Sequence, residues 1–306
     1  MVDTDLPRIA ILDDYQKVAF TFADWTPLRD RAIIDVYHDT LHDEDALAQR
    51  LEPYQIICAM RERTKFPASL LDRLPNLQLI TTTGSKNRGI DLPHAKSKGI
   101  FVSNTTGGGN STQEHIWALI LGTARHLALE HSGLKASRQA WQTTIPIGLS
   151  GKTLGLVGVG KLGEGAAKIA KAFGVEFAAS KEELFQSSDV VSIHMVLSER
   201  TYRLVTEADL RLMKPTAVFI NTSRGPLVDE AGLIAVLKEK KIVGAGLDVF
   251  DVEPLPLDHP FRRLENVTLS PHLGYVSDDA YKVWWPETVE NIVAFLDGKP
   301  QRPLSA

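Results

Sequence analysis

The chain has 306 residues, of which 43% are hydrophobic, and its net charge is −4 with both signs interspersed. A chain of this length can bury two domain-sized cores. The charge pattern excludes a broad basic face for nucleic acid or an anionic membrane, and no run approaches the roughly 18 apolar residues of a membrane span.

Cys58 is the only cysteine of the chain. A single cysteine excludes an intramolecular disulfide and a cysteine-rich metal site, and we predict no metal centre. Acidic residues stand at Asp3 and Asp5, where a signal peptide would carry positive charge. We therefore predict a cytoplasmic protein in a reducing compartment.

Short β-rich apolar runs alternate with helical patterns in the first part of the chain, which predicts a parallel α/β layer. The clearest strands are RIAILDD at 8–14, QIICAM at 55–60 and LQLITTTG at 77–84. Between them, residues 43–51 and 67–75 carry apolar residues three or four apart, as crossover helices do. This block predicts a small doubly wound unit of about 100 residues.

A long apolar helical stretch follows at residues 111–132. Ser111 and Glu114 have the spacing of a capping box, which predicts the start of the helix. The stretch is apolar on more than one side, so it favours either a core helix or a helix that crosses between domains or meets a partner subunit. Residues 138–152 then form a loop-like connector.

A second α/β series follows the connector, so the fold class is α/β with two doubly wound parallel-sheet domains. The last helix, expected over 278–298, contains Pro286, which predicts a kink or two shorter helices. Trp284 and Trp285 in that helix favour core packing, with a substrate-facing indole as the alternative. The expected strands of the second series are 153–160, 175–179, 189–196, 217–225, 243–250 and 267–274.

A glycine pattern, Gly158-x-Gly160-x-x-Gly163, follows the first of these strands and opens a helix. The glycines permit a tight turn, close approach of the backbone to a pyrophosphate, and close packing of the helix on the strand. The free N–H groups at the helix start, from Lys161 and Leu162, would face the anion. The pattern alone is weak, but its position between strand and helix predicts a dinucleotide site.

Three later loops end strands of the same sheet and carry a cation, a carboxylate and an imidazole: Arg224, Glu253 and His272. Ligands of an open α/β sheet collect at the carboxyl ends of its strands. Each residue alone also fits a structural role: a solvated turn arginine, a carboxylate before a proline turn, or one of nine histidines.

Reduction of a 2-keto acid needs all three groups. Hydride addition to a carbonyl carbon leaves negative charge on the oxygen, so an acid must deliver a proton there, and histidine titrates in the useful range. A neighbouring carboxylate would fix the tautomer of the imidazole. An arginine would bind the substrate carboxylate or polarise the carbonyl.

The chain resembles the D-isomer-specific 2-hydroxyacid dehydrogenase family, which includes phosphoglycerate and glyoxylate/hydroxypyruvate reductases. The stretches that match best are GKTLGLVGVGKLG at 151–163, SDVVSIH at 188–194, MKPTAVFINTSRGPLVDE at 213–230, AGLDVFDVEPLP at 245–256 and NVTLSPHLGY at 266–275. Weaker agreement extends upstream through residues 81–105 and 111–121.

The resemblance implies hydride transfer between a nicotinamide cofactor and a small D-2-hydroxy or 2-keto acid. It assigns the catalytic constellation to Arg224, Glu253 and His272, with Glu253 pairing the proton donor His272. The substrate carboxylate would meet the first domain near three residues: Arg61, Gly84 and Ser85.

The resemblance also implies where the cofactor lies. The implied cofactor is NAD, with NADP as the alternative. Asp248 would lie near the nicotinamide carboxamide, and Thr222 and Ser223 would line the cofactor cleft.

The family pattern implies a flavodoxin-like substrate domain of residues 1–101 plus 281–306 and a Rossmann cofactor domain of residues 102–280. It further implies a homodimer joined through the cofactor domain, with the long helix from Ser111 in the contact.

One departure from the family pattern lies after Gly174, where the helix joins VEFAA directly. A strand and its loop, on the order of 20 residues, are absent between Gly174 and Val175, and with them the acidic residue expected to bind the adenosine ribose. In one interpretation VEFAA moves into the second-strand position, and Ser180-Lys181 takes the place of the ribose contact. In the other, VEFAA keeps its family position and the sheet lacks a strand.

The role of Lys181 is open within the first interpretation. Lys181 could attract the extra phosphate of NADP. Alternatively, Ser180 and Glu183 form a capping box, and Lys181 is an exposed residue of the first helical turn.

Two functional hypotheses compete on this basis. The leading one is an oxidoreductase with His272 as general acid and base. Its rival is a catalytically impaired or silent dinucleotide-fold protein that acts by dimerisation or binding, because part of the cofactor domain is missing.

Overall fold

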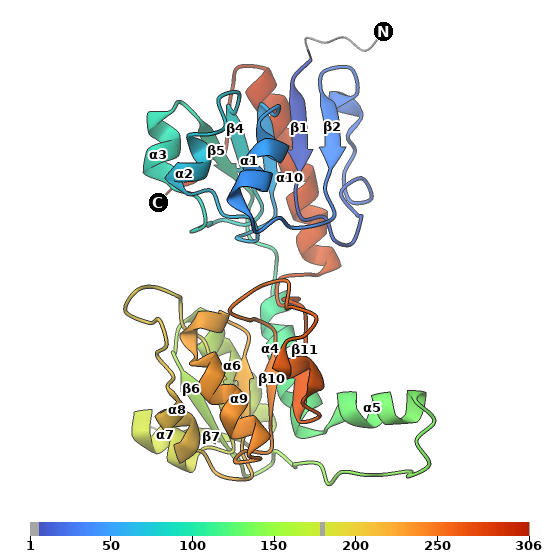
Figure 1. Cartoon of the computed structure of the whole chain (residues 1–306), viewed down its shortest axis with the longest axis vertical. Helices are drawn as coiled ribbons and strands as arrows, with labels where there is room; N and C mark the ends of the chain where they lie inside the picture. The colour runs from blue at the N-terminus through green and yellow to red at the C-terminus, as the bar shows by residue number, and fades with distance from the viewer. Residues whose placement is uncertain (1–5, 178–180, 306) are drawn as a thin grey trace. The chain divides into compact units, whose positions relative to one another are not determined.

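The computed structural model describes residues 6–177 and 181–305. The chain divides into two compact units (Figure 1): unit 1 is Met1–Gly109 with Ser277–Ala306, and unit 2 is Asn110–Val276. Each unit contains one parallel sheet, and the predicted α/β class with two doubly wound domains is confirmed.

The sheet of unit 1 has the strand order β2-β1-β3-β4-β5, which is the flavodoxin-like order. Its central strands are buried on both faces, as parallel strands covered by crossover helices must be. The strands are β1 (Arg8–Ile11), β2 (Ile33–Val36), β3 (Ile56–Ala59), β4 (Leu79–Thr82) and β5 (Phe101–Asn104).

Helices cover both faces of this sheet. Three helices bury their apolar residues in one cluster against it: α1 (Glu44–Leu51), α2 (Ala68–Leu71) and α3 (Leu92–Ser97). The 3₁₀ helix η1 (Thr26–Leu28) and α10 (Asp278–Leu296) contact each other, and α10 packs on β4.

Helix α10 is one helix of 19 residues with Pro286 inside it, so of the two predicted outcomes, a kink or two shorter helices, the second is wrong. The missing N–H of Pro286 costs one intrahelical bond, and the burial of neighbouring side chains offsets that cost. Trp285 is 1% exposed and packs near the rings of Trp25 and Tyr281. Trp284 is also buried, and its Nε1–H donates to the carbonyl of Thr106 over 2.9 Å, so both indoles are core groups.

The sheet of unit 2 has the order β11-β10-β9-β8-β6-β7. Helices α4 and α6 share one apolar cluster with its strands, and α7, α8 and α9 share another, which places helices on both faces. The strands are β6 (Thr153–Val157), β7 (Glu176–Phe177), β8 (Val190–Ile193), β9 (Val218–Asn221), β10 (Gly244–Leu247) and β11 (Val267–Leu269).

The first helical stretch of unit 2 differs from its prediction. The stretch predicted as one helix is two, because His126 adopts a left-handed φ of 50° between them. The predicted Ser111–Glu114 capping box is also absent, since the N-cap is Asn110 without a side-chain hydrogen bond. The helices of unit 2 are α4 (Ser111–Ala124), α5 (Leu127–Lys135), α6 (Lys161–Ala172), α7 (Lys181–Ser187), α8 (Glu207–Leu212), η2 (Gly225–Leu227), α9 (Glu230–Lys238) and η3 (Pro260–Arg263).

The junction after α6 runs directly from helix to strand. Gly174 has a φ of 67°, and the N–H of Val175 donates to the carbonyl of Ala170 over 3.2 Å. β7 then pairs in parallel with Thr153 and Leu154 of β6, which is the second-strand position. Ser180 lies outside the described residues, and Lys181 is the first residue of α7.

Within residues 6–177 and 181–305, no helix has the length and apolar character needed to cross a membrane.

Trp285→Ala should lower the free energy of unfolding by about 3–5 kcal/mol, because it removes a large, fully enclosed side chain from unit 1. Urea unfolding followed by far-UV circular dichroism measures this change. Leu257→Ala is the control, since Leu257 is 89% exposed and its removal should change the free energy by less than about 0.5 kcal/mol. Similar small effects for both variants would contradict the core role of Trp285.

Candidate active site

The candidate site of unit 2 lies where its parallel strands end. Parallel strands present their carboxyl ends at one edge of the sheet, so the loops that follow them meet there. These loops are the glycine turn after β6, the segment after β8, the Arg224 loop after β9, the Glu253 loop after β10 and the His272 loop after β11.

The glycine turn has the geometry that a pyrophosphate site requires. Gly158 has a φ of 102°, and a Cβ there would lie 2.6 Å from Met195 Sδ. A Cβ on Gly163 would lie 2.4 Å from the carbonyl oxygen of Gly158, so only glycine lets α6 pack this closely on the turn. A Cβ on Gly160 would meet open space, which leaves the approach to the helix start clear.

The start of α6 has unsatisfied donors. Its N-cap is Gly160, which has no side chain to cap the helix, and the first N–H groups of a helix have no intrahelical partner. Lys161 and Leu162 are the first two residues of the helix, and their amides suit an anion together with the helix dipole. The residues present therefore fit the pyrophosphate of a dinucleotide.

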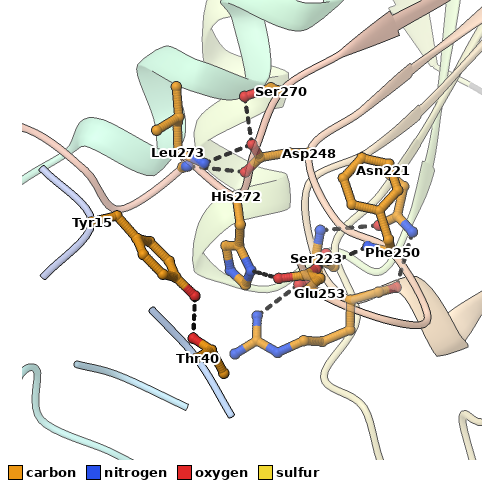
Figure 2. Close-up of polar contacts among 12 residues, drawn as sticks. Tyr15, Thr40, Asn221, Ser223, Asp248, Phe250, Glu253, Ser270, His272 and Leu273 are labelled. Carbon is orange, nitrogen blue, oxygen red and sulfur yellow. Dashed lines mark hydrogen bonds and ion pairs between the residues drawn. The ribbon is translucent and has the colours of Figure 1, made fainter. Parts of the chain in front are cut away.

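His272 and Glu253 form a direct pair (Figure 2). Nδ1 of His272 lies 2.5 Å from Oε2 of Glu253. Oε1 of Glu253 accepts the N–H of Phe250 over 2.9 Å, which fixes the carboxylate in its loop. A carboxylate only accepts, so Nδ1 carries the proton in this pair and the tautomer of His272 is assigned.

Arg224 lies in a tightly held loop. Its Nη1 donates to the carbonyl of Ser223 over 2.7 Å, and its own carbonyl accepts from Asn221 Nδ2 over 2.9 Å. The hydroxyl of Ser223 donates to Ile193 over 2.7 Å, so this residue ties β9 to β8. A Cβ on Gly225 would lie 2.1 Å from the carbonyl carbon of Phe250, so the Arg224 and Glu253 loops touch through their backbones.

The other residue predicted to line the cofactor cleft beside Ser223 is Thr222. It is buried directly after β9.

Asp248, predicted near the nicotinamide carboxamide, is fully buried and has several donors. Its Oδ1 lies 2.7 Å from Ser270 Oγ, 2.7 Å from the N of Leu273 and 3.1 Å from His115 Nε2. Its Oδ2 accepts the N–H of Gly274 over 2.9 Å. Burial opposes ionisation, but the His115, Ser270 and Leu273 donors outweigh it and hold the pKa of Asp248 below its usual range.

His115 and Ser270 were not among the residues predicted from the sequence. A signal for His115 exists, because Thr112, His115, Leu119 and Thr123 share one face of a helix at spacings of three and four. A histidine on such a buried face needs a polar partner.

His194 follows β8 beside the glycine turn. Its backbone N–H donates to Val157 over 2.8 Å. Both ring nitrogens are covered, and within the described chain neither has a hydrogen-bond partner. Burial lowers the pKa of His194 to about 4, so the ring is neutral at pH 7.

In unit 1, the three predicted substrate contacts lie together. Arg61 has a left-handed φ of 53°, and its Nη1 donates to the carbonyl of Thr83 over 3.1 Å. A Cβ on Gly84 would lie 1.7 Å from Arg61 Nη1, so the guanidinium covers that glycine. The N–H of Gly84 already donates to Thr105 Oγ1 over 2.7 Å, and Ser85 is exposed next to it.

Among residues 6–177 and 181–305, no group of three His, Cys, Asp or Glu side chains is placed to hold a metal ion.

Comparison with known proteins identifies relatives over most of the chain. The profile described as "D-isomer specific 2-hydroxyacid dehydrogenase, NAD binding domain" matches residues 117–181 and 175–274, two stretches that overlap after the junction at Gly174. A glyoxylate reductase of Thermofilum pendens is 33% identical, with 90% of this chain and 84% of the relative covered. A hydroxypyruvate reductase of Thermotoga maritima is 35% identical, with 82% and 88% covered.

The fold also matches a solved structure. The phosphoglycerate oxidoreductase of Vibrio cholerae O395 is 36% identical and superimposes with a TM-score of 0.88. The match covers 96% of this chain and 100% of that one, so both units are included.

Asp248→Asn should be less stable than the native chain at pH 5, and this difference in the free energy of unfolding should shrink as the pH falls to 3. A carboxylate whose folded pKa is depressed contributes stability above its unfolded pKa, near 4, and loses it as the pH falls through the folded value. Urea unfolding of both proteins at pH 5 and pH 3 measures the difference.

Asp251→Asn is the control of opposite sign. Burial, together with the nearby Glu230, raises the pKa of Asp251, so its contribution is present below the unfolded pKa and is lost as the pH rises. A stability difference that is independent of pH for Asp248→Asn would contradict an ionised Asp248.

Proposed function

The chain belongs to the D-isomer specific 2-hydroxyacid dehydrogenase family, and we propose that it reduces a small 2-keto acid, or oxidises the matching D-2-hydroxy acid, with His272 as general acid and base. The His272–Glu253 pair at 2.5 Å is the observation that carries this proposal. The glyoxylate and hydroxypyruvate reductases among the relatives make these two keto acids the first substrates to test.

The pair supports a defined direction of proton transfer. Glu253 accepts the Nδ1–H of His272, and we assign Nε2 of the same ring to the substrate. When bound, the nicotinamide cofactor supplies the hydride. The Nε2–H proton passes to the carbonyl oxygen as that oxygen becomes a hydroxyl, and the neutral ring removes this proton in the reverse reaction.

We assign the positive charge of the site to Arg224. Its loop touches the Glu253 loop at Gly225, which supports a guanidinium that polarises the carbonyl or binds the substrate carboxylate. We propose that the substrate carboxylate contacts Arg61, Gly84 and Ser85 of unit 1.

We propose that the N-terminus of α6 holds the cofactor pyrophosphate, with Thr222, Ser223 and Asp248 nearer the nicotinamide. The residues after β7 are Ala178, Ala179, Ser180 and Lys181, so the sequence has no carboxylate where the adenosine ribose is usually bound. NAD is the proposed cofactor, and NADP is the alternative that the absent carboxylate leaves open.

His272→Gln should lower kcat for glyoxylate or hydroxypyruvate by about 10²-fold or more while NADH still binds, because only the proton donor is lost. Absorbance assays of NADH and NADPH oxidation, together with fluorescence titration of each cofactor, measure both effects.

His259→Gln is the matched control. His259 also pairs with a carboxylate, Glu230, over 3.1 Å, and its pair is 15% and 21% exposed against 20% and 24% for the candidate pair. His259→Gln should keep its activity. A native chain that binds neither cofactor, or full activity of His272→Gln, would contradict the proposal and favour a silent binding protein.

We also propose a homodimer that forms through unit 2. Helix α5 and the segment after it, residues 136–145, are here called the arm, and the arm carries exposed apolar side chains. Helix α5 has no buried residue, and Figure 1 shows it and the segment after it set apart from the other helices of unit 2. Trp141 and Ile145 are 76% and 93% exposed. Glu130 accepts hydrogen bonds from Arg138 and Thr144, which holds the arm in shape and supports a surface built for a partner.

Trp141→Glu should convert the dimer into a monomer, because a charge would be buried in the apolar contact. Size-exclusion chromatography with light scattering measures the mass. Leu257→Glu, at a similarly exposed position outside the arm, should leave the mass unchanged. A native chain that is monomeric at micromolar concentration would contradict the proposed dimer.

The proposed location is the cytoplasm. Cys58 is buried in β3, and burial raises the pKa of its thiol, so it remains an unreactive thiol. An unpaired, unreactive cysteine supports a reducing compartment.

A further inference from the structure

The Asp248 cluster connects helix α4 to the loop that carries His272. We propose that His115 is a positioning residue: through Asp248 and Ser270 it fixes the backbone of residues 272–274, and so the place of His272. This inference rests on the proposed function for its kinetic part and stands on geometry within unit 2 for the rest.

The donors in the cluster can be assigned from the hydrogen bonds. Ser270 Oγ lies 2.7 Å from Asp248 Oδ1 and 2.9 Å from His115 Nε2. A carboxylate only accepts, so the one hydroxyl proton of Ser270 goes to Asp248. His115 Nε2 must then carry a proton of its own, which it directs at Asp248 Oδ1, 3.1 Å away, and at Ser270 Oγ.

Asp248 in turn holds three consecutive amides after β11. Its backbone carbonyl accepts the N–H of His272 over 2.8 Å. Its carboxylate accepts the N–H groups of Leu273 and Gly274 over 2.7 and 2.9 Å, and Figure 2 shows Asp248 between Ser270 and this loop. A single residue therefore sets the path of the chain through His272.

His272 needs such support because its backbone is unusual. It has a φ of 54°, in the left-handed region that a residue with a Cβ adopts rarely. A conformation of this kind persists only where surrounding contacts impose it. The amides of the loop turn are bound by Asp248, so a loosened Asp248 would release His272 from its pair with Glu253.

His115 supplies the fourth hydrogen-bond donor to the Asp248 carboxylate and connects that carboxylate to α4. A carboxylate this deeply buried stays ionised only if hydrogen bonds replace water, and His115 is the donor that a helix supplies. The same helix turn also lies against the loop, since a Cβ on Gly274 would be 3.6 Å from Thr112 Cγ2 and 3.9 Å from His115 Cδ2. A shift of α4 would therefore move the loop that carries His272.

Amide hydrogen exchange tests the positioning role without any turnover. In His115→Leu, the amides of residues 272–274 should exchange at least about tenfold faster than in the native chain, while those of β9 stay unchanged. His115→Gln keeps an N–H donor of similar reach, so its exchange should stay within about threefold of the native rates.

Thr123→Val is the matched control for packing. Thr123 lies on the same face of α4, and in the described part of the chain its hydroxyl has no hydrogen-bond partner. Valine keeps the shape of the side chain, so exchange in the 272–274 loop should not change. If His115→Leu does not fold, His115→Asn takes its place, since its amide is one methylene too short to reach Asp248.

The kinetic arm separates positioning from binding. His115→Leu should lower kcat about tenfold and weaken cofactor binding by a smaller factor, and His115→Gln should restore most of the lost kcat. Equal exchange at 272–274 in the native chain and His115→Leu would overturn the inference, as would faster exchange that spreads equally to β9. A native chain without turnover would count against the proposed function, and the exchange result would still decide this inference.

Discussion

The hydrogen bond between His272 Nδ1 and Glu253 Oε2, 2.5 Å long, joins two loops that come from different strands, and the candidate chemistry depends on this pair. Neither loop sets that distance alone. The Glu253 side is held by the N–H of Phe250, whose backbone in turn touches Gly225 next to Arg224. The His272 side is held by Asp248. Parallel pairing of β9, β10 and β11 brings these supports to one edge of the sheet.

The three candidate catalytic residues could be predicted because each follows a strand that its sequence reveals. Arg224, Glu253 and His272 come after apolar β-rich runs, and the geometry of parallel sheets then predicts that they meet. The role of Asp248 could not be predicted in the same way. It also follows a strand, but whether its carboxylate faces a ligand or the protein depends on donors from α4, and His115 lies 133 positions away in the sequence.

Local backbone features were the hardest to predict, because residue type does not mark them. Arg61, His126 and His272 have left-handed backbones at residues that are not glycine, and tertiary contacts impose this conformation. At His126 it divides a stretch that has helical periodicity throughout. Pro286 is the opposite case, since a residue that usually breaks a helix stays inside α10 where packing around Trp285 outweighs its local preference.

The short β7 bears more on the proposed binding of the adenosine ribose than on the proposed binding of the pyrophosphate. The proposed pyrophosphate turn, from Gly158 to Gly163, precedes the junction at Gly174 and packs against Met195, which follows β8. The ribose end comes after β7, and its usual carboxylate is absent from the sequence. β7 is at one edge of the sheet, next to β6, whereas Arg224, Glu253 and His272 follow β9, β10 and β11 toward the other edge. A change at the junction therefore bears first on cofactor affinity and on the choice between NAD and NADP, because the groups proposed to move the proton are held by contacts that do not involve β7.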